Sequence, residues 1–245
     1  MPRRSAVATR RTPRAQPALT RDKIVAAAIE LADSEGIDGL SMRKLGQTLG
    51  VDPMSLYNHV RDKDELLDGV ADAIVAEISS GTDGSAWKSS LRETVLAARR
   101  TMLRHPWAAA VLESRVTPGP ATMRYMEVVL RTLREGGFPI DLAHHGLHVM
   151  GSRIFGFSQD LFDDKAEPIP DQAALAAMSA SMAADFPNIA ELAMAVRHEG
   201  GLGGCDDDVE FEFGLDLILD GLERLLRRSR QSTSPARKMT SPPRK

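Results

Sequence analysis

The chain has 245 residues, of which 42% are hydrophobic, 27% charged and 4% aromatic, with a formal net charge of -3. Its apolar share excludes a disordered chain and suits one or two globular domains. Few aromatic residues, with abundant Ala, Leu, Met, Arg and Glu, favour helices over strands.

No apolar run reaches the roughly 20 residues of a membrane-spanning helix, and no apolar segment of a secretory signal follows the N-terminus. Cys205 is the only cysteine, which excludes an internal disulfide and a cysteine-based zinc cluster. We therefore expect a cytoplasmic protein with no membrane partner.

The basic residues are concentrated at the two ends of the chain. Residues 1–23 hold seven Lys or Arg and one acid, and residues 224–245 hold eight basic residues and no acid. The remaining middle of the chain has a net charge of -17, since 16 of the 31 basic and 33 of the 34 acidic residues lie there. Basic arms either contact nucleic-acid phosphates or remain solvated, and both readings stay open. We predict disorder over 1–19 and 229–245.

The first helix is predicted to begin at Thr20, a good N-cap residue, and to end at Gly36. A second short helix is predicted over 41–49, with Ser41 as its N-cap and Gly50 as a left-handed residue at its end. The apolar residues of the first helix recur at helical spacing; they are Ile24, Ala27, Ala28, Leu31 and Ala32.

A third helix is predicted from Pro53 to about Val60. Asp52 is a good N-cap, and proline suits the first helical position because no backbone N–H is needed there. Asp62 and Glu65 indicate the start of a fourth helix in the manner of a capping box. The apolar stripe of this fourth helix consists of Leu66, Val70, Ile74 and Ile78.

Residues 79–86, SSGTDGSA, break the helical pattern and form the predicted boundary between domains of residues 20–78 and 87–228. The later predicted helices are 87–104, a short one after Pro106, 121–135, 141–162, 171–183, 188–198 and 207–228. The last has apolar residues at spacings of three and four, namely Phe211, Leu215, Ile218, Leu219, Leu222 and Leu226. Without an internal repeat or a convincing strand, the predicted fold class is all-α.

The helices at 41–49 and 53–60, joined by a glycine turn, form a predicted helix-turn-helix. At 100° per residue, Leu56 and Val60 face inward and Pro53 lies at the edge. A varied, outward-facing second helix suits the DNA major groove, although such helix pairs also occur in proteins that do not bind DNA. The residues that point away or lie on the flanks are Met54, Ser55, Tyr57 and Asn58.

The chemistry of these side chains fits DNA recognition. Asn58 can donate or accept at a base edge, and Met54 can contact a thymine methyl group. Ser55 suits either base or phosphate, whereas His59 falls nearer the buried side of the helix and favours a packing role. Phosphate contacts suit Tyr57, Lys63 and Arg43, of which Arg43 also suits guanine.

Residues 19–78 contain LTRDKIVAAAIELADSEG, followed after two residues by GLSMRKLGQTLGVDPMSLYNHVRDKDELLDGV. These stretches resemble, without a gap, the DNA-binding domain of the TetR family of bacterial transcriptional repressors. The resemblance implies a three-helix head, joined by a fourth helix to a helical ligand-binding and dimerisation domain. It implies DNA contacts by Ser41, Met42, Arg43, Pro53, Met54, Ser55, Tyr57, Asn58, His59 and Lys63.

Two of these positions, Asn58 and His59, do not fully fit the family resemblance. The tryptophan or phenylalanine often found in the family where Asn58 stands is absent, so a base preference is not carried over. At His59 the resemblance implies a phosphate contact that the helical wheel does not favour.

Three stretches, LRHPW, MRYMEVVLRTLREGGFPIDLAHHGLHVMGSRIFGF and FEFGLDLILDGLERL, resemble the C-terminal domain of the tetracycline-repressor branch. This implies a homodimer in which the helices at 141–162 and 207–228 form a four-helix bundle with those of the partner. The apolar stripe of the last helix suits that interface and equally suits an internal core. A dimer would present two recognition helices to half-sites about 34 to 36 Å apart.

The C-terminal part also contains candidate ligand residues. Their soft apolar character suits an uncharged or aromatic effector, although ordinary core packing explains most of them equally well. His144 and His148 have the spacing of a metal pair, but with His145 they lack an adjacent carboxylate, and we predict no metal and no cofactor. The candidate effector residues are Met102, His105, Trp107, Phe138, His148, Met150 and Phe155.

No catalytic motif is present: there is no G-x-S-x-G, no P-loop, no H-E-x-x-H and no G-x-G-x-x-G behind a strand. We therefore predict a ligand-responsive, DNA-binding transcriptional regulator that is not an enzyme. We expect a repressor that a small molecule releases from a pseudo-palindromic operator. A helical interaction or scaffold protein is the alternative, and a helical enzyme a more distant one.

Overall fold

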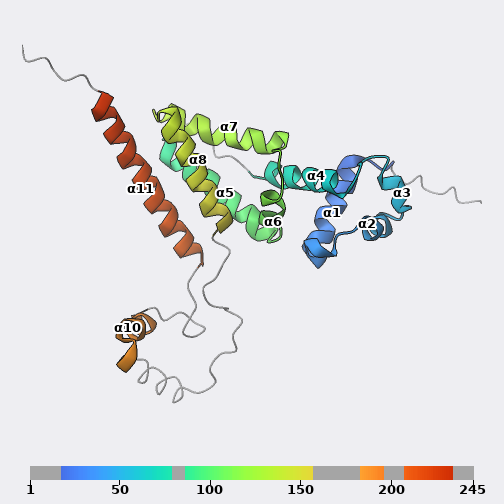
Figure 1. The fold of residues 1–245 in the computed structure, drawn as a ribbon, viewed down its shortest axis with the longest axis horizontal. Helices are drawn as coiled ribbons and strands as arrows, with labels where there is room; N and C mark the ends of the chain where they lie inside the picture. Colours follow the sequence, from blue (N-terminus) through green and yellow to red (C-terminus); the bar gives the residue numbers. More distant parts are fainter. Residues whose placement is uncertain (1–17, 79–85, 157–182, 196–206, 234–245) are drawn as a thin grey trace, which may run out of the picture. The chain divides into compact units, whose positions relative to one another are not determined.

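The computed structural model describes residues 18–78, 86–156, 183–195 and 207–233, and these form helices and turns with no strand among them (Figure 1). This confirms the predicted all-α class. The chain divides into two compact units between Ala73 and Ile74, a point that lies inside a helix. The predicted boundary segment lies outside the described residues except for Ala86.

The described residues of the N-terminal unit form three helices, a short 3-10 turn and most of a fourth helix. Its core is formed by the apolar faces of these helices, with Ile24, Leu45 and Leu66 fully buried. The elements are α1 (Arg21–Glu35), η1 (Ile37–Gly39), α2 (Met42–Leu49), α3 (Pro53–Leu56) and α4 (Lys63–Ala76).

Side-chain caps begin each of the four helices where the sequence predicts them. Thr20 Oγ1 and Ser41 Oγ each accept a hydrogen bond, at 3.3 Å, from the backbone N–H three residues later. Asp52 Oδ1 accepts from Met54 N at 2.8 Å, and Asp62 Oδ1 from Glu65 N at 2.8 Å. These bonds satisfy N–H groups that have no partner within the helix, so short polar side chains fix the helix starts.

The helix α3 is shorter than predicted, because it ends at Leu56 rather than near Val60. The N–H groups of Asn58 and His59 donate to the carbonyls of Ser55 and Leu56, at 3.3 and 2.9 Å. These bonds to the third residue back tighten the chain into a turn, which ends the α-helix.

The C-terminal unit begins with the last residues of α4. Its described residues include the helices α5 (Trp87–Arg104), α6 (Ala108–Glu113), α7 (Pro120–Glu135), α8 (Ile140–Gly156), α10 (Pro187–Ala195) and α11 (Asp207–Thr233), and residues 183–185 are also helical. They confirm the predicted helices within the described ranges. The predicted helix at 171–183, apart from its last position, and residues 157–162 and 196–198 lie outside the described residues.

The last helix is longer than predicted and includes residues 229–233, which the sequence assigns to a disordered tail. The guanidinium of Arg230 donates to the carbonyl of Gly136 at 2.8 Å. Ser229 Oγ donates to the carbonyl of Leu226 at 3.0 Å. The Arg230 bond holds the end of α11 against the end of α7, a long-range contact that local composition does not reveal, whereas the Ser229 bond lies within α11.

The core of the C-terminal unit lies among α5, α7, α8 and α11. It includes the fully buried side chains of Leu133, Phe138, Phe211 and Leu215. Trp87 packs edge-to-face on Phe138 with ring centroids 4.7 Å apart. No described helix is long and apolar enough to cross a membrane.

Candidate functional site

The two helices of the predicted helix-turn-helix meet at a glycine. A Cβ atom on Gly46 would lie 3.1 Å from Cγ of Pro53, so the absence of a side chain allows α2 and α3 to approach closely. Gly50 has φ 66° and ψ 31°, the left-handed conformation that glycine adopts without a steric penalty. The backbone N–H of Val51 donates to the carbonyl of Gly46 at 2.9 Å and closes the turn.

The second helix separates a buried side from an exposed one, as the helical wheel predicts. Leu56 and Val60 are buried, whereas Met54 is 70% exposed, Tyr57 is 43% exposed and Asn58 is exposed. The buried pair anchors the segment in the N-terminal core. The exposed groups present a sulfur, a phenol and an amide to solvent on one short segment.

The other predicted DNA-contacting residues differ in their accessibility. Arg43 and Lys63 are exposed. Ser41 is exposed but its hydroxyl oxygen caps α2. Met42, Pro53, Ser55 and His59 are half-buried. The arrangement brings the predicted residues together around α2 and α3, and their contacts with DNA stay predictions.

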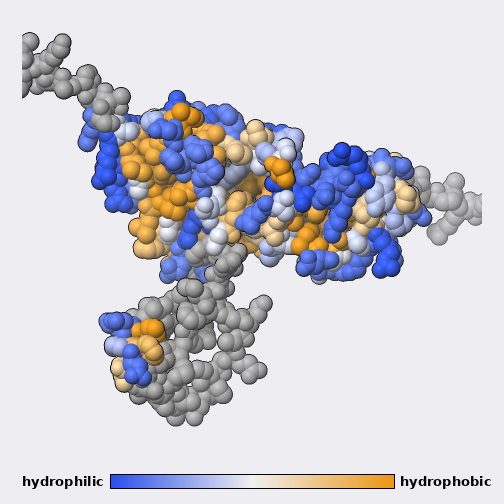
Figure 2. All heavy atoms as spheres, in the orientation of Figure 1, coloured by the Kyte–Doolittle hydropathy of each residue, from blue (hydrophilic) through white to orange (hydrophobic). Residues whose placement is uncertain are grey.

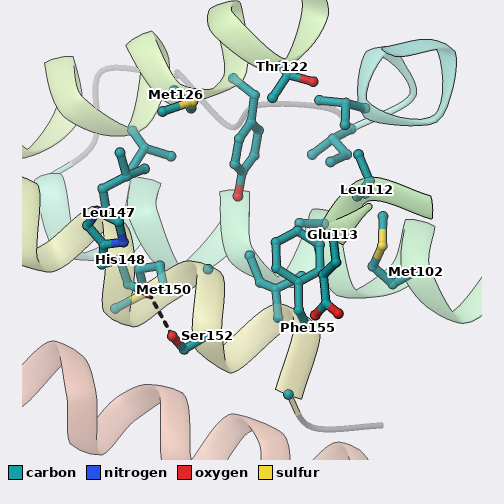
Figure 3. A pocket seen from close by; sticks show the side chains of 18 of the residues that line it. Met102, Leu112, Glu113, Thr122, Met126, Leu147, His148, Met150, Ser152 and Phe155 are labelled. Carbon is teal, nitrogen blue, oxygen red and sulfur yellow. Dashed lines mark hydrogen bonds between the residues drawn. The ribbon is translucent and has the colours of Figure 1, made fainter. Parts of the chain in front are cut away.

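The C-terminal unit contains a cavity of about 740 Å³ among α5, α6, α7 and α8, with Val75 of α4 in its wall. This volume lies within the range of about 300 to 1,000 Å³ that is usual for small-molecule sites. Figure 3 shows Thr122 and Met126 of α7 facing this space, together with Met150 and Phe155 of α8. The lining is predominantly apolar and rich in methionine.

A small number of polar groups interrupt this lining. The Nε2 atoms of His144 and His148 are 3.1 Å apart, and Ser152 Oγ donates to the carbonyl of His148 at 3.1 Å (Figure 3). The hydroxyl of Tyr125 is buried and has no hydrogen-bond partner among the described residues. Burial raises the pKa of Tyr125 far above its ordinary value, because the phenolate would be desolvated.

Four of the predicted effector residues, Met102, His148, Met150 and Phe155, line this cavity. The other three pack elsewhere in the C-terminal unit and are absent from the described lining. His105 lies 3.3 Å from Glu77 through its Nε2 atom and packs edge-to-face on Trp107. Phe138 packs on Trp87 in the core. These packing contacts account for the three residues, and effector binding by the lining residues stays a prediction.

Tyr125 and Glu113 line the cavity and were missed as ligand candidates by the sequence reasoning. The sequence does hold a signal for Tyr125. This residue lies four positions after Ala121 and four before Val129, both buried, so its hydroxyl belongs to the buried face of α7. Among the described residues, no group of three or more His, Cys, Asp or Glu side chains could hold a metal ion.

Comparisons with known proteins agree with both parts of this geometry. Residues 24–70 match the family described as "Bacterial regulatory proteins, tetR family". Residues 80–226 match "Tetracyclin repressor-like, C-terminal domain", which by itself covers more than half of the chain. The chain belongs to the TetR family. This TetR-family protein therefore combines the helix-turn-helix head with the helical C-terminal domain that the sequence resemblance implies.

Individual relatives cover most of the chain. The HTH-type transcriptional repressor DrrR1 of Streptomyces coeruleorubidus is 33% identical over 230 residues, which is 90% of this chain and 83% of the relative. The Tetracycline repressor protein class D of Escherichia coli is 32% identical over 209 residues, or 84% and 89% of the two chains. ActR of Streptomyces coelicolor in complex with actinorhodin matches this TetR-family protein with a TM-score of 0.68 and 32% identity, covering 86% and 99%.

Proposed function

We propose that this protein is a transcriptional repressor that binds operator DNA through α2 and α3 and is released by a small molecule bound in the C-terminal cavity. The observation that carries the proposal is the contrast between the buried anchor Leu56 of α3 and the exposed side chains of Met54 in α3 and Tyr57 directly after it. The relative DrrR1 is named a repressor, and ActR has been solved with a small molecule bound. An interaction or scaffold role does not account for the cavity together with this head.

In this proposal, the DNA contacts divide into base readout and phosphate binding. Asn58 and Met54 read base edges in the major groove, and Ser55 bonds base or phosphate. The exposed cations Arg43 and Lys63 bind phosphates, which gives affinity but little sequence information. The full proposed contact set is Ser41, Met42, Arg43, Pro53, Met54, Ser55, Tyr57, Asn58, His59 and Lys63.

The proposed response to ligand depends on α4. This helix begins at Lys63, a proposed DNA contact, and Val75 near its end lines the cavity. A ligand that favours a different position of Val75 would move the N-terminal head and misplace two dimer-related recognition helices. A coupling free energy of about 1 to 3 kcal/mol would change operator affinity roughly 5- to 150-fold. The proposed site of action is the cytoplasm, and no catalytic step is proposed.

Selection of bound sequences from a random pool of duplex DNA tests this function. We expect recovery of a pseudo-palindrome whose half-sites are related by one or more helical turns. Binding to the recovered duplex should weaken steeply as salt concentration rises, because counterions are released when cations meet phosphates. Enrichment of no sequence, with affinity independent of salt, would favour the scaffold alternative.

Two substitutions test the assigned surface on the recovered operator. Arg43→Ala should weaken binding roughly tenfold and lower the slope of the salt dependence by about one, as expected for loss of one phosphate contact. Tyr57→Phe removes one exposed hydroxyl and should weaken binding by a smaller factor. Gel shifts that are unchanged for both variants would contradict the assigned surface, and circular dichroism should show both variants folded.

A further inference from the structure

Two histidines on α8 bring their ring nitrogens together at the surface of the C-terminal unit. His144 and His148 lie four positions apart, on successive turns of the helix, and both residues are exposed. Their Nε2 atoms are 3.1 Å apart, and their rings are edge-to-face with centroids 4.5 Å apart. Each ring therefore turns the nitrogen that lies farther from its backbone toward the other ring.

The distance between these nitrogens fits two ligands of one metal ion. Nitrogen–metal bonds of about 2.0 to 2.1 Å, at angles between the octahedral and tetrahedral values, place two imidazole nitrogens about 2.8 to 3.4 Å apart. A hydrogen bond between the rings also allows 3.1 Å, but it is strongest when donor and acceptor are nearly in line. Two rings in line would have centroids about 5.4 Å apart, so the observed 4.5 Å means that the rings are inclined, as chelating rings are.

The helix preorganises this pair. Ala143, Gly146 and Met150 are buried on the core-facing side of α8 and hold the helix in the C-terminal unit. A spacing of four positions on a helix is also the one with which two histidines bind zinc in metalloproteases, because it places both rings on one face. Little rearrangement is therefore needed for both nitrogens to bind the same ion.

We infer that His144 and His148 form a surface site for a divalent first-row metal ion such as Ni²⁺, Cu²⁺ or Zn²⁺. Imidazole nitrogen is a preferred ligand of these ions, whereas Mg²⁺ and Ca²⁺ prefer oxygen. The sequence-based prediction of no metal relied on the missing carboxylate, which such ions do not require. Among the described residues no group of three or more metal-binding side chains occurs, so water completes the coordination. This inference goes beyond the proposed function, because it requires neither operator DNA nor an effector.

Calorimetric titration of the untagged, full-length protein with Ni²⁺ tests this site. We expect saturable binding of one ion per chain at metal concentrations well below millimolar. His144→Gln and His148→Gln should each weaken this binding roughly tenfold or more, because loss of a ligand should cost at least as much as loss of a group that orients one. Circular dichroism should show both variants folded, as is usual for substitutions at exposed positions.

His145→Gln is the matched control. His145 is exposed on the same helix, and its ring centroid lies 5.6 Å from that of His144, but it projects about 100° further around the helix. This variant should keep the wild-type affinity for Ni²⁺. Equal losses in all three variants would contradict the inference, since binding would then depend on the whole group of histidines and not on the pair.

Electron paramagnetic resonance of the protein loaded with Cu²⁺ identifies the ligands directly. The wild type should show superhyperfine splitting from two nitrogens, and His144→Gln and His148→Gln should each show splitting from one. Ni²⁺ should also raise the melting temperature of the wild type and of His145→Gln, because an ion bound to the folded helix stabilises it. The melting temperatures of the other two variants should not respond.

Two outcomes would overturn the inference. Unchanged Ni²⁺ affinity in both His144→Gln and His148→Gln would mean that the ion binds at other residues of the chain. If the wild type shows no saturable Ni²⁺ binding, the two rings form a hydrogen-bonded pair and no metal site. Neither outcome bears on operator binding, which is measured separately.

Discussion

At the scale of single residues, Leu56 and Met54 lie two positions apart in α3 and have opposite surroundings. Leu56 is fully buried, and Met54 is largely exposed. Leu56→Ala should lower the free energy of unfolding of the N-terminal unit by about 2 to 5 kcal/mol, through lost burial and the cavity left behind. Urea denaturation measures this change, when unfolding of the N-terminal unit is monitored through hydrogen exchange of the backbone amides in α1 and α2.

Met54→Ala is the control for this prediction. It should change the free energy of unfolding by less than about 0.5 kcal/mol, as is usual for an exposed side chain, and should still weaken operator binding. Equal destabilisation by the two substitutions would contradict the assignment of buried and exposed sides to α3.

At the scale of helices, α5 and α11 are joined by a row of ion pairs at their surface. Arg92 bonds to Glu212 at 2.7 Å and to Asp216 at 2.8 Å, and Arg99 bonds to Asp208 at 2.9 Å. Residues later in α5 pair with residues earlier in α11, so the two helices run antiparallel. The row thus fixes the register of two helices that are far apart in the sequence. Some of the acidic residues in the middle of the chain are therefore used in contacts between helices.

The guanidinium groups on the C-terminal core also contact an aromatic ring. Arg99 lies over Phe211 with its Cζ atom 4.3 Å from the ring centroid, and Arg153 lies 4.8 Å from the same centroid. Arg153 also donates to the carbonyl of Phe211 at 3.0 Å. The start of α11 is therefore held by cation–π contacts and hydrogen bonds in addition to apolar burial.

The row of ion pairs predicts a dependence of stability on pH. Lys88 bonds to Asp220 and, at 3.2 Å, to Glu223. The hydrogen bond from Lys88 lowers the pKa of Asp220, and bonds from Arg227 and then Lys88 lower the pKa of Glu223. A carboxyl whose pKa is lower in the folded state stabilises the fold above its unfolded pKa. That stabilisation is lost as the pH falls through the folded value.

Thermal melts between pH 7 and about pH 3 test this expectation. The wild-type melting temperature should fall as the pH drops below about 4. The variant carrying Asp220→Asn and Glu223→Gln should melt lower than wild type at pH 7 and lose less stability across the acidic range. If the melting temperatures of the two proteins fall by the same amount between pH 7 and about pH 3, the ion pairs of Lys88 do not stabilise the contact of α5 with α11.

At the scale of the whole molecule, α11 has a second apolar face that the described residues do not cover. Phe213 is 61% exposed and Leu217 is 52% exposed, and hydrophobic residues gather over α8 and α11 in Figure 2. The exposed apolar residues of α11 recur mainly at four-residue spacing, at Val209, Phe213, Leu217 and Leu225. Such a stripe suits a two-fold interface between copies of the chain, as proposed from the family resemblance.

Charge placed in this stripe should separate the proposed dimer. Phe213→Glu combined with Leu217→Glu should give a monomer by light scattering, because each carboxylate would be buried without a partner. The monomer should bind the operator more weakly than the dimer, because its single recognition helix contacts only one of the two half-sites. Val116→Glu is the control, because Val116 is 97% exposed outside α11. A dimeric double variant would contradict the assignment of this face.

Most of the fold could be predicted from local signals. The caps at Thr20, Ser41, Asp52 and Asp62 lie where polar N-cap residues precede apolar periodicity, and Gly50 has the left-handed conformation that its position requires. These features depend on interactions within about one helical turn, which the local sequence encodes directly. The outward groups of α3 follow from the same periodicity.

Only the tertiary structure decided where distant elements meet. The contact of Arg230 with Gly136 extends α11 to Thr233, and the packing of Phe138 on Trp87 keeps that ring in the core and away from the cavity. The unpaired hydroxyl of Tyr125 likewise becomes visible only when the faces of α5, α7 and α8 are assembled. Sequence spacing determines which side of a helix a residue occupies, but long-range packing determines what that side faces.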